Sequence, residues 1–346
     1  MSFHQDLDNM TRDMHEASLE VEYMKKTPVL SLILEQKNQK FNGGKQYYFE
    51  VDTDTTEDLA QDYSVNDVLT HGTEDTTERV TFTRKHFQVP VQLDLDEELQ
   101  NALDNEDGTK LHDLAAFKVK KTNEAGRLHL RKLIYGSASD SAKQIQGLNS
   151  ALTVDATYGQ VTRTNASSIA DWWQPNDNQN TAVEQATSTT FSITWLQGVW
   201  DKLQDLEAAG ASVILGNTLW LALKAEAHAK SMPIEVNKDM KFKYGIEDIN
   251  IEGMRVIKDP FLQTKYNTAM SQTTGAAGSL DRRVYIFNAA DWKLMTHPRR
   301  NFKMTEFFDQ KKIANGSDFE LARLLYAGNL CCTHPNRSAY YSNVVP

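Results

Sequence analysis

Cysteine and long apolar runs are both scarce in this sequence of 346 residues, and each scarcity excludes a class of protein. The two cysteines, Cys331 and Cys332, are neighbours, and such a pair supplies neither a disulfide framework nor a four-ligand metal site. No apolar run approaches the roughly 20 residues of a membrane-spanning helix, and even the apolar stretch 29–34 is interrupted by Ser31. We therefore expect a protein of a reducing compartment with no membrane partner.

A secretory signal is also missing. Residues 2–8 contain neither the basic start nor the apolar core that a signal peptide requires. The protein is therefore expected to stay in the cytoplasm in which it is made.

The sequence patterns of common enzymes are absent as well. The nine histidines are scattered without an HExxH pattern, and there is no glycine-rich nucleotide loop and no GxSxG elbow. We therefore expect no catalytic residues, no metal and no cofactor. A soluble hydrolase with an unrecognised pair of carboxylates stays open as an alternative, because acidic residues are abundant.

What the sequence does contain is a strongly acidic segment. The chain has 37 basic and 47 acidic residues, and a net charge of −10 argues against wrapping around duplex DNA. Ten acids and no Lys or Arg lie between Glu50 and Glu78, so the remainder is balanced. Apolar residues alternate with polar ones over residues 47–52 and 80–95, which predicts strands on both sides. A solvated loop is one reading; we favour an extended arm whose tip reaches another molecule.

Helical periodicity marks two further regions. An apolar stripe over residues 3–24 predicts an amphipathic helix that ends at Pro28. A second helical region is expected from Asp96 to Tyr135, interrupted by a turn at residues 105–108. The stripe expected to pack is Leu111, Ala115, Val119, Thr122, Gly126, Leu130 and Leu133. The polar faces of this region carry a basic group that would complement the acidic segment of another copy. The members of this group are Lys118, Lys120, Lys121, Arg127, Arg131 and Lys132.

The chain is longer than one hydrophobic core usually absorbs, so we expect two lobes. Residues 136–190 are rich in small and polar residues and predict an ordered connection into the second lobe, which mixes helices and strands. The expected helices are residues 194–209 and 218–229, and the expected strands are residues 212–215, 254–257, 283–287, 301–308 and 319–332. The last strand is largely apolar, which predicts that it is buried and returns to the first lobe.

Several short segments, in order, resemble tailed-phage major capsid proteins. They are residues 213–217, 251–260, 283–297 and 326–337, with Thr157–Arg163 ahead of Trp172 and Trp173. Relatives often carry Gly-Gly-Ile-Asp-Arg in place of the Thr157–Arg163 segment, so its contacts stay open here. The resemblance covers roughly residues 40 to 340.

This resemblance implies the Hong Kong 97-type capsid fold. That α+β fold has an N-terminal arm, an extended β loop, a peripheral domain with a long spine helix, and an axial α/β domain. In this sequence the arm would be residues 1–40 and the extended loop, a β hairpin with an acidic tip, residues 41–95. The peripheral domain would be residues 96–150 and 295–346, and the axial domain residues 151–294.

The resemblance also implies a structural function and no enzyme activity. The chain would assemble with copies of itself into hexamers and pentamers of an icosahedral head that encloses double-stranded phage DNA without sequence-specific binding. It would assemble in the host cytoplasm and remain in the virion. A separate scaffolding protein is expected, because no scaffolding segment fits before the arm, together with a portal and a decoration protein. The shell protein of an encapsulin-like nanocompartment is the alternative within the same fold.

Contacts between subunits are the sites expected from this function. In the acidic segment the candidates are Asp52, Asp54, Glu57, Asp58 and Asp62. On the partner they are the six basic residues named above and, in second place, Arg299 and Arg300. Some relatives join subunits by a Lys–Asn isopeptide bond from the extended loop, but no lysine lies between Lys45 and Lys85. We therefore expect a non-covalent shell.

Overall fold

The computed structural model describes most of the chain. The described residues are 27–35, 44, 46–52, 64, 77–94, 114–136, 143–153, 156–163, 173, 189–205, 210–232, 235–236, 248–251, 253–267, 279–309 and 319–346. The expected helix over residues 3–24 and the region 96–113 lie outside this set.

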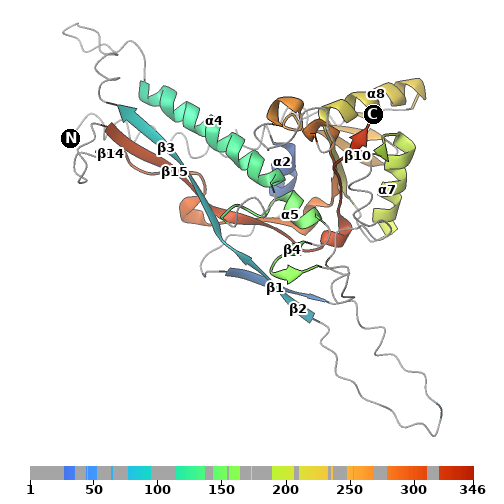
Figure 1. Cartoon of the computed structure of the whole chain (residues 1–346), viewed down its shortest axis with the longest axis horizontal. Helices are drawn as coiled ribbons and strands as arrows, with labels where there is room; N and C mark the ends of the chain where they lie inside the picture. The colour runs from blue at the N-terminus through green and yellow to red at the C-terminus, as the bar shows by residue number, and fades with distance from the viewer. Residues whose placement is uncertain are drawn as a thin grey trace.

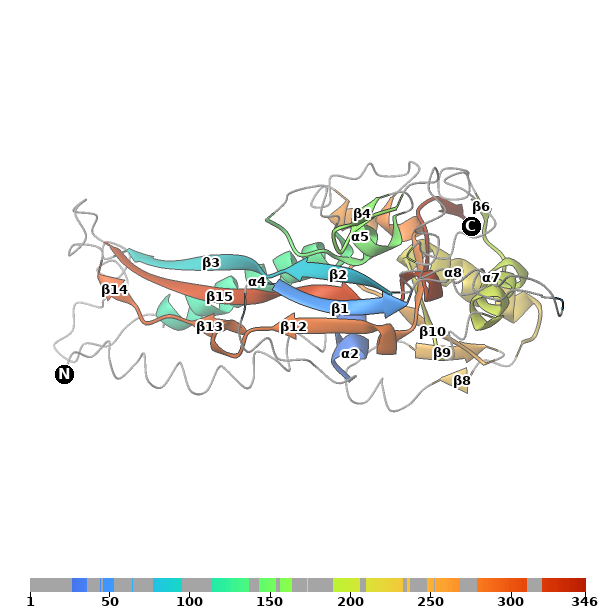
Figure 2. The same cartoon turned by 90° about the horizontal axis from the view of Figure 1, so that it is seen from below.

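A long antiparallel sheet forms the first lobe (Figures 1 and 2). Its central strand is β15 (Phe319–Cys332), which has the bounds predicted from the sequence. Along one edge β15 pairs with β3 (Lys85–Asp94) over ten residues, from Phe319 opposite Asp94 to Gly328 opposite Lys85. This pairing confirms that the late apolar strand returns to the first lobe.

The opposite edge of β15 is covered by three shorter strands. They are β12 (Trp292–Thr296), β13 (Lys303–Met304) and β14 (Phe308–Asp309). The prediction of a single strand over residues 301–308 is wrong, because the segment forms two short strands, β13 and β14, and Thr305 between them is not part of either. Its backbone N–H donates to the carbonyl of Arg323 at 2.9 Å, and its hydroxyl accepts from the Arg323 N–H.

The helix α4 (Leu114–Tyr135) lies along one face of this sheet and contacts β3 and β15 (Figure 1). The apolar stripe predicted for this helix is buried at Val119, Thr122, Gly126, Leu130 and Leu133. The spacing of three and four residues therefore identified the face that packs on the sheet.

A hairpin extends from the first lobe. Its strands β1 (Gln46–Asp52) and β2 (Thr77–Thr83) are antiparallel, with Asp52 opposite Thr77. The two strands expected on either side of the acidic segment therefore pair with each other. Arg84 then links β2 directly to β3.

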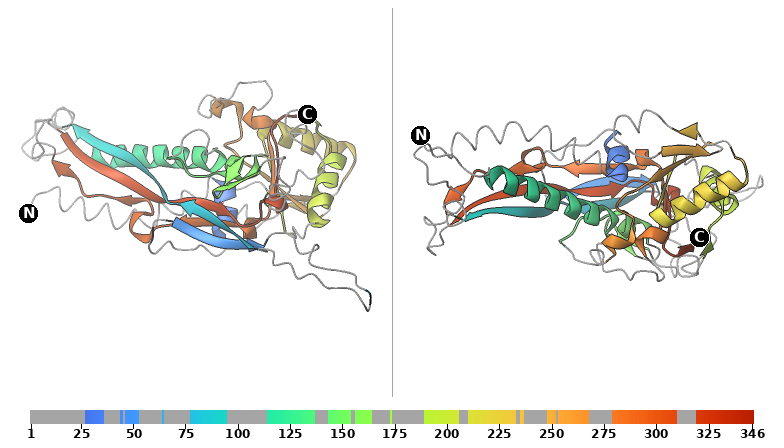
Figure 3. Two further views of the ribbon diagram at one scale, coloured as in Figure 1. Left: turned by 60° about the horizontal axis from the view of Figure 1, so that its bottom comes forward. Right: turned by 90° about the horizontal axis from the view of Figure 1, so that it is seen from above.

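The second lobe contains a six-stranded mixed sheet in the order β16-β11-β7-β10-β9-β8. These strands are Ala339–Tyr341, Val284–Phe287, Ser212–Leu215, Met254–Lys258, Asp248–Ile251 and Glu235–Val236. The helices α7 (Ile193–Asp205) and α8 (Asn217–Ala229) lie in this lobe (Figure 3). Their apolar side chains form part of its core. The strand β16 adds the end of the chain to the sheet and so ties the two lobes together.

Short elements complete the fold. The helices are α2 (Pro28–Glu35), α5 (Leu148–Leu152), η3 (Thr264–Tyr266), η5 (Leu280–Arg282), η6 (Ala289–Asp291), η7 (Pro298–Arg300) and η9 (Pro335–Arg337). The strands β4 (Thr157–Tyr158) and β5 (Val161–Thr162) form a small hairpin, and β6 (Thr189–Thr190) pairs with β17 (Val344–Val345). Among the described residues, the long helices included, no helix has both the length and the apolar character needed to cross a membrane.

Pro28 begins α2, and the helix that we expected to end at this proline lies outside the described residues. Proline is well tolerated at the first helical position, where its missing N–H has no partner to lose and its φ angle already suits the helix. The carbonyl of Thr27 accepts from Ser31 N at 3.0 Å and so closes the first turn. Val29, Leu30, Leu32 and Ile33 of α2 are buried, and the helix contacts β12 (Figure 2).

Candidate assembly surfaces

Aromatic side chains anchor the base of the β1–β2 hairpin. The ring of Phe49 stacks on Phe82 with centroids 5.8 Å apart, and Phe82 meets Tyr158 edge-on at 5.1 Å. The fully buried Trp173 stacks on Tyr158 at 5.8 Å. Because these rings come from distant parts of the chain, the hairpin is fixed to the first lobe at its base, which suits it to carry a loop to another molecule.

The β4–β5 hairpin packs directly against β2. Its two turn residues, Gly159 and Gln160, have φ angles of 60° and 68°, which is the pattern of a type I′ turn. The carbonyl of Gly159 accepts from Thr81 N at 2.8 Å. A Cβ on Gly159 would lie 2.1 Å from Cγ1 of Val80, so only glycine permits this close approach. The β4–β5 hairpin is part of the Thr157–Arg163 segment, whose contacts could not be predicted from the sequence.

Arg163, at the end of this segment, is fully buried and holds several loops together. Its guanidinium donates to the carbonyls of Ser150, Ala151, Thr153, Ala156 and Trp173 at distances of 2.7 to 3.3 Å. Sequence reasoning did not identify this role, because an isolated arginine in a polar stretch gives no sign of burial.

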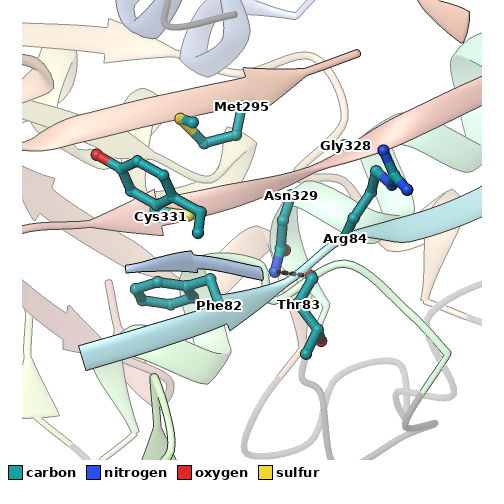
Figure 4. A pocket seen from close by; sticks show the side chains of 8 residues that line it. Phe82, Thr83, Arg84, Met295, Gly328, Asn329 and Cys331 are labelled. Atoms are coloured by element: carbon teal, nitrogen blue, oxygen red, sulfur yellow. Dashed lines mark hydrogen bonds between the residues drawn. The ribbon is translucent and has the colours of Figure 1, made fainter. Parts of the chain in front are cut away.

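Asn329 of β15 forms a second polar junction (Figure 4). Its Nδ2 donates to the carbonyl of Thr83 at 2.9 Å and its Oδ1 accepts from Gln146 N at 3.0 Å. The adjoining pocket has room for about one water molecule and is lined by Tyr47, Phe82, Thr83, Arg84, Met295, Gly328, Asn329 and Cys331. A pocket this small is a packing feature and holds no substrate.

The structure separates the six basic candidates of α4. Arg131 is buried, and its Nε donates to Oγ1 of Thr27 at 2.8 Å, so its assignment to a subunit contact is wrong. Lys118 donates to the carbonyl of Gln92 at 2.9 Å, and Lys121 pairs with Glu124 at 3.1 Å. Both lysines thus bind within their own subunit. Three candidates stay on the helix surface, namely the exposed Lys120 and the half-buried Arg127 and Lys132.

The acidic candidates lie at or beyond the end of the hairpin. Asp52 is the last residue of β1. Asp54, Glu57, Asp58 and Asp62 lie outside the described residues.

The second-choice candidates, Arg299 and Arg300, are exposed on η7. This turn is capped by His297, whose Nδ1 accepts from Arg299 N at 3.2 Å. Partial burial lowers the pKa of His86, and the nearby Arg84, Arg300 and His297 lower it further. Arg84, His297 and Arg300 therefore lie near His86, and of these four residues sequence reasoning had named only Arg300 as a contact.

Metal binding finds no support among the described residues, where no three His, Cys, Asp or Glu side chains are grouped to hold an ion. The two cysteines are buried, and burial raises the pKa of both thiols.

Comparison with solved structures identifies the fold. The capsid protein of cyanophage A-1(L) aligns with a TM-score of 0.60 at 11% identity, over 93% of this chain and 93% of that one. This chain has the fold of a capsid protein. The SrpI encapsulin of Synechococcus elongatus shares this capsid fold with a TM-score of 0.53 at 12% identity, over 92% and 88% of the two chains. A structure from Mycobacterium phage Ogopogo aligns with a TM-score of 0.50 at 11% identity, over 91% of both. No protein-family model and no curated protein matches the sequence of this capsid-fold chain.

Proposed function

We propose that this chain is the major capsid protein of a tailed phage. The observation that carries the proposal is the end-to-end correspondence with the cyanophage capsid protein, which leaves little of either chain unmatched. Copies of the chain assemble into hexamers and pentamers, and these close into an icosahedral head around double-stranded DNA. The protein therefore belongs to the virion and acts without catalysing a reaction.

The parts of the chain divide this task in the manner of the Hong Kong 97-type fold. Residues 1–40 are the arm, residues 41–95 the extended loop, and residues 96–150 with 295–346 the peripheral domain with α4 as its spine helix. The end of this last range departs from the division, because β16 and β17 pair with β11 and β6 of the second lobe. Residues 151–294 form the axial domain, which meets its copies at the centre of each capsomer. The aromatic anchor at Phe49, Phe82 and Trp173 supports this assignment, because a loop that reaches a neighbour needs a fixed base.

Apolar burial supplies most of the strength of these contacts, and charge selects the partner. Obligate interfaces bury on the order of 2,000 Å² or more, whereas an exposed ion pair contributes only ~0.2–1 kcal/mol. Head-to-tail contacts of one surface on a different surface of the next copy generate rings, as a capsomer requires. The acidic segment of one copy and basic residues of the next are such a pair of surfaces.

Other partners follow from the same function. A separate scaffolding protein guides assembly, a portal occupies one vertex, and a decoration protein binds the outside. DNA meets an inner wall with little net positive charge and is held without sequence-specific contacts, since tight phosphate binding requires a basic face.

Particle size is the decisive test. Negative-stain microscopy and analytical ultracentrifugation of the purified chain should show capsomers or shells across a range of salt and scaffold conditions. A chain that stays monomeric or dimeric under all of them would exclude a capsid protein. The hydrolase alternative predicts that outcome together with turnover of a substrate.

The match to the SrpI encapsulin supports the encapsulin alternative. Its TM-score of 0.53 is lower than the 0.60 of the cyanophage capsid protein. An encapsulin shell encloses protein, whereas a phage head encloses DNA. Particles purified after nuclease treatment should therefore retain DNA of uniform length. Particles that contain protein cargo and no protected DNA would assign the chain to the nanocompartments.

A further inference from the structure

Two of the four large apolar side chains that are strongly exposed in the described part of the chain lie on one face of α4. Phe117 is 57% exposed and Leu128 is 40% exposed. They belong to a row of residues spaced by four and three positions, which is the spacing of one helix face. We call this row the outer stripe; its members are Phe117, Lys121, Glu124, Leu128 and Arg131. The opposite side of the helix holds the buried residues Val119, Thr122, Gly126, Leu130 and Leu133.

The first described residue lies at the end of the outer stripe. Oγ1 of Thr27 accepts from Nε of Arg131 at 2.8 Å, and α2 begins with the next residue (Figure 1). This contact buries Arg131, while the other members of the outer stripe are not buried. The residues that precede Thr27 therefore enter the structure directly beside the outer stripe.

Residues 3–24 match the outer stripe in length and pattern. This segment and α4 each have 22 residues, which extend about 33 Å as a helix. The apolar residues of the segment are also spaced by four and three positions. They are Phe3, Leu7, Met10, Met14, Ala17, Val21 and Met24.

The charges of the two surfaces are complementary. Residues 3–24 contain six acids and a single arginine. The surface of α4 beside the outer stripe is basic, with the exposed Lys120 and the half-buried Arg127 and Lys132. Opposite charges of this kind fix the register of two surfaces whose apolar residues meet.

Arg131 gives an independent reason to expect an acidic partner. Its Nη2 is buried and has no hydrogen-bond partner among the described residues. Asp259 attracts Arg131, but both oxygens of that carboxyl group already accept hydrogen bonds from other residues. The preceding segment carries acids as far as Glu22, and a carboxylate from it would pair with the guanidinium.

We infer that residues 3–24 form a helix that docks on the outer stripe of α4 in the same chain. The inference goes beyond the proposed function and does not depend on assembly. The segment enters beside Arg131 in the last turn of α4, and the exposed Phe117 lies near the first turn. The two helices therefore run parallel.

This direction sets the level of each contact. Because both helices rise by the same distance per residue from the contact between Thr27 and Arg131, Met24 lies at the level of Leu128. Met14 lies near the level of Phe117 for the same reason. The two exposed apolar side chains of the outer stripe are thus covered by apolar residues of the segment.

Hydrogen exchange of the full-length chain, kept below its assembly concentration, tests the docking. We expect the amides of residues 7–24 to exchange at least tenfold more slowly than in a free peptide of residues 1–26. The variant Phe117→Asp/Leu128→Asp should raise their exchange rate about tenfold, because it removes the apolar contacts of the outer stripe. The matched control Leu221→Asp alters an exposed leucine of α8 and should leave the rate within about twofold of the wild type. Slow exchange of α4 in both variants shows that they are folded.

Cross-linking shows which chain supplies the segment. In the variant Met14→Cys/Phe117→Cys, mild oxidation should join the two new thiols within one chain, while the two native cysteines are buried. The control Glu16→Cys/Phe117→Cys moves the first thiol to the other side of the expected helix and should cross-link at least tenfold more slowly. Non-reducing gels and peptide mapping measure both products.

Three results would overturn the inference. The wild-type segment exchanges as fast as the free peptide, the Leu221→Asp control speeds exchange as much as the outer-stripe variant does, or the disulfide joins two chains. The last result would assign the outer stripe to the segment of a second copy. A chain that forms shells but gives any of these results keeps its proposed function, and a docked segment in a chain that never assembles leaves the inference standing.

Discussion

The hydroxyl of Tyr135 donates a hydrogen bond to Oδ2 of Asp259 at 2.5 Å and so links the two lobes. Tyr135 is the last residue of α4, and Asp259 directly follows β10 of the second lobe. Oδ1 of Asp259 accepts from Phe261 N at 2.7 Å, and the ring of Phe261 stacks on Tyr135 at 5.8 Å. Both polar groups are fully buried, so the end of α4 is fixed to the second lobe by a contact that water cannot replace.

Removing this hydroxyl should destabilise the protein. The variant Tyr135→Phe leaves a buried carboxyl group short of one donor, and we expect the free energy of unfolding to fall by about 1–3 kcal/mol. Chemical denaturation of the unassembled chain measures the loss. Tyr326→Phe is the matched control, because the buried Tyr326 hydroxyl has no hydrogen-bond partner among the described residues. A loss as large in the control would show that the Tyr135 bond itself contributes nothing.

Asp259 should make stability depend on pH. Burial raises the pKa of Asp259 in the folded protein, against the opposing effects of the Tyr135 and Phe261 hydrogen bonds and of Arg131. A carboxyl group with a raised folded pKa contributes fully below its unfolded pKa of about 3.9, and this contribution is lost as pH rises through the folded pKa.

The variant Asp259→Asn removes that titration. The stability of the wild type relative to the variant should therefore fall as pH rises from about 4 to 7, measured by urea denaturation at each pH. A difference that is constant over this range, or one that grows, would contradict the raised pKa.

Arg163 should be among the most sensitive positions in the chain. The variant Arg163→Met removes the donor shared by five backbone carbonyls, and we expect a loss of about 3–5 kcal/mol in the free energy of unfolding. Thermal or chemical denaturation measures it. The exposed Arg299→Met is the control and should change stability by less than about 0.5 kcal/mol. Equal effects at the two positions would show that the buried network is not needed.

Two glycines, Gly159 in the β4–β5 turn and Gly253 between β9 and β10, separate backbone strain from steric contact. Gly159 and Gly253 both have positive φ angles, of 60° and 85°, but only at Gly159 would a Cβ collide with a neighbour. Gly253→Ala should cost about 1–2 kcal/mol for the backbone alone, and Gly159→Ala about 2–5 kcal/mol because Val80 must also move. Denaturation curves give both values. A smaller loss at Gly159 than at Gly253 would contradict the tight contact between the β4–β5 hairpin and β2.

Mature particles should be held together without covalent bonds. No lysine lies between Lys45 and Lys85, so the tip of the extended loop has no amine with which to form an isopeptide bond. Denaturing gels of boiled, DNA-containing particles should show one band near 39.2 kDa. A ladder of higher bands would show that another lysine of the chain supplies a cross-link.

Local patterns in the sequence were sufficient for the regular elements. The bounds of β15 follow from one long segment rich in apolar residues, and the buried face of α4 follows from the spacing of Val119, Thr122, Gly126, Leu130 and Leu133. Both signals reside in neighbouring residues, so no tertiary contact is needed to read them. The acidic segment between paired strands is a signal of the same kind, and it pointed to the extended loop.

Only the tertiary structure decided which charged residues are buried and which of them lie close together. Arg131 has the sequence context of a surface residue, but α2 brings Thr27 against it and buries it. Arg84 and His86 join His297 and Arg300 only because β15 lies between β3 and η7. Periodicity reports which side of an element is apolar, whereas the neighbours of a charge depend on pairings between segments that are far apart in sequence, and no local pattern encodes these pairings.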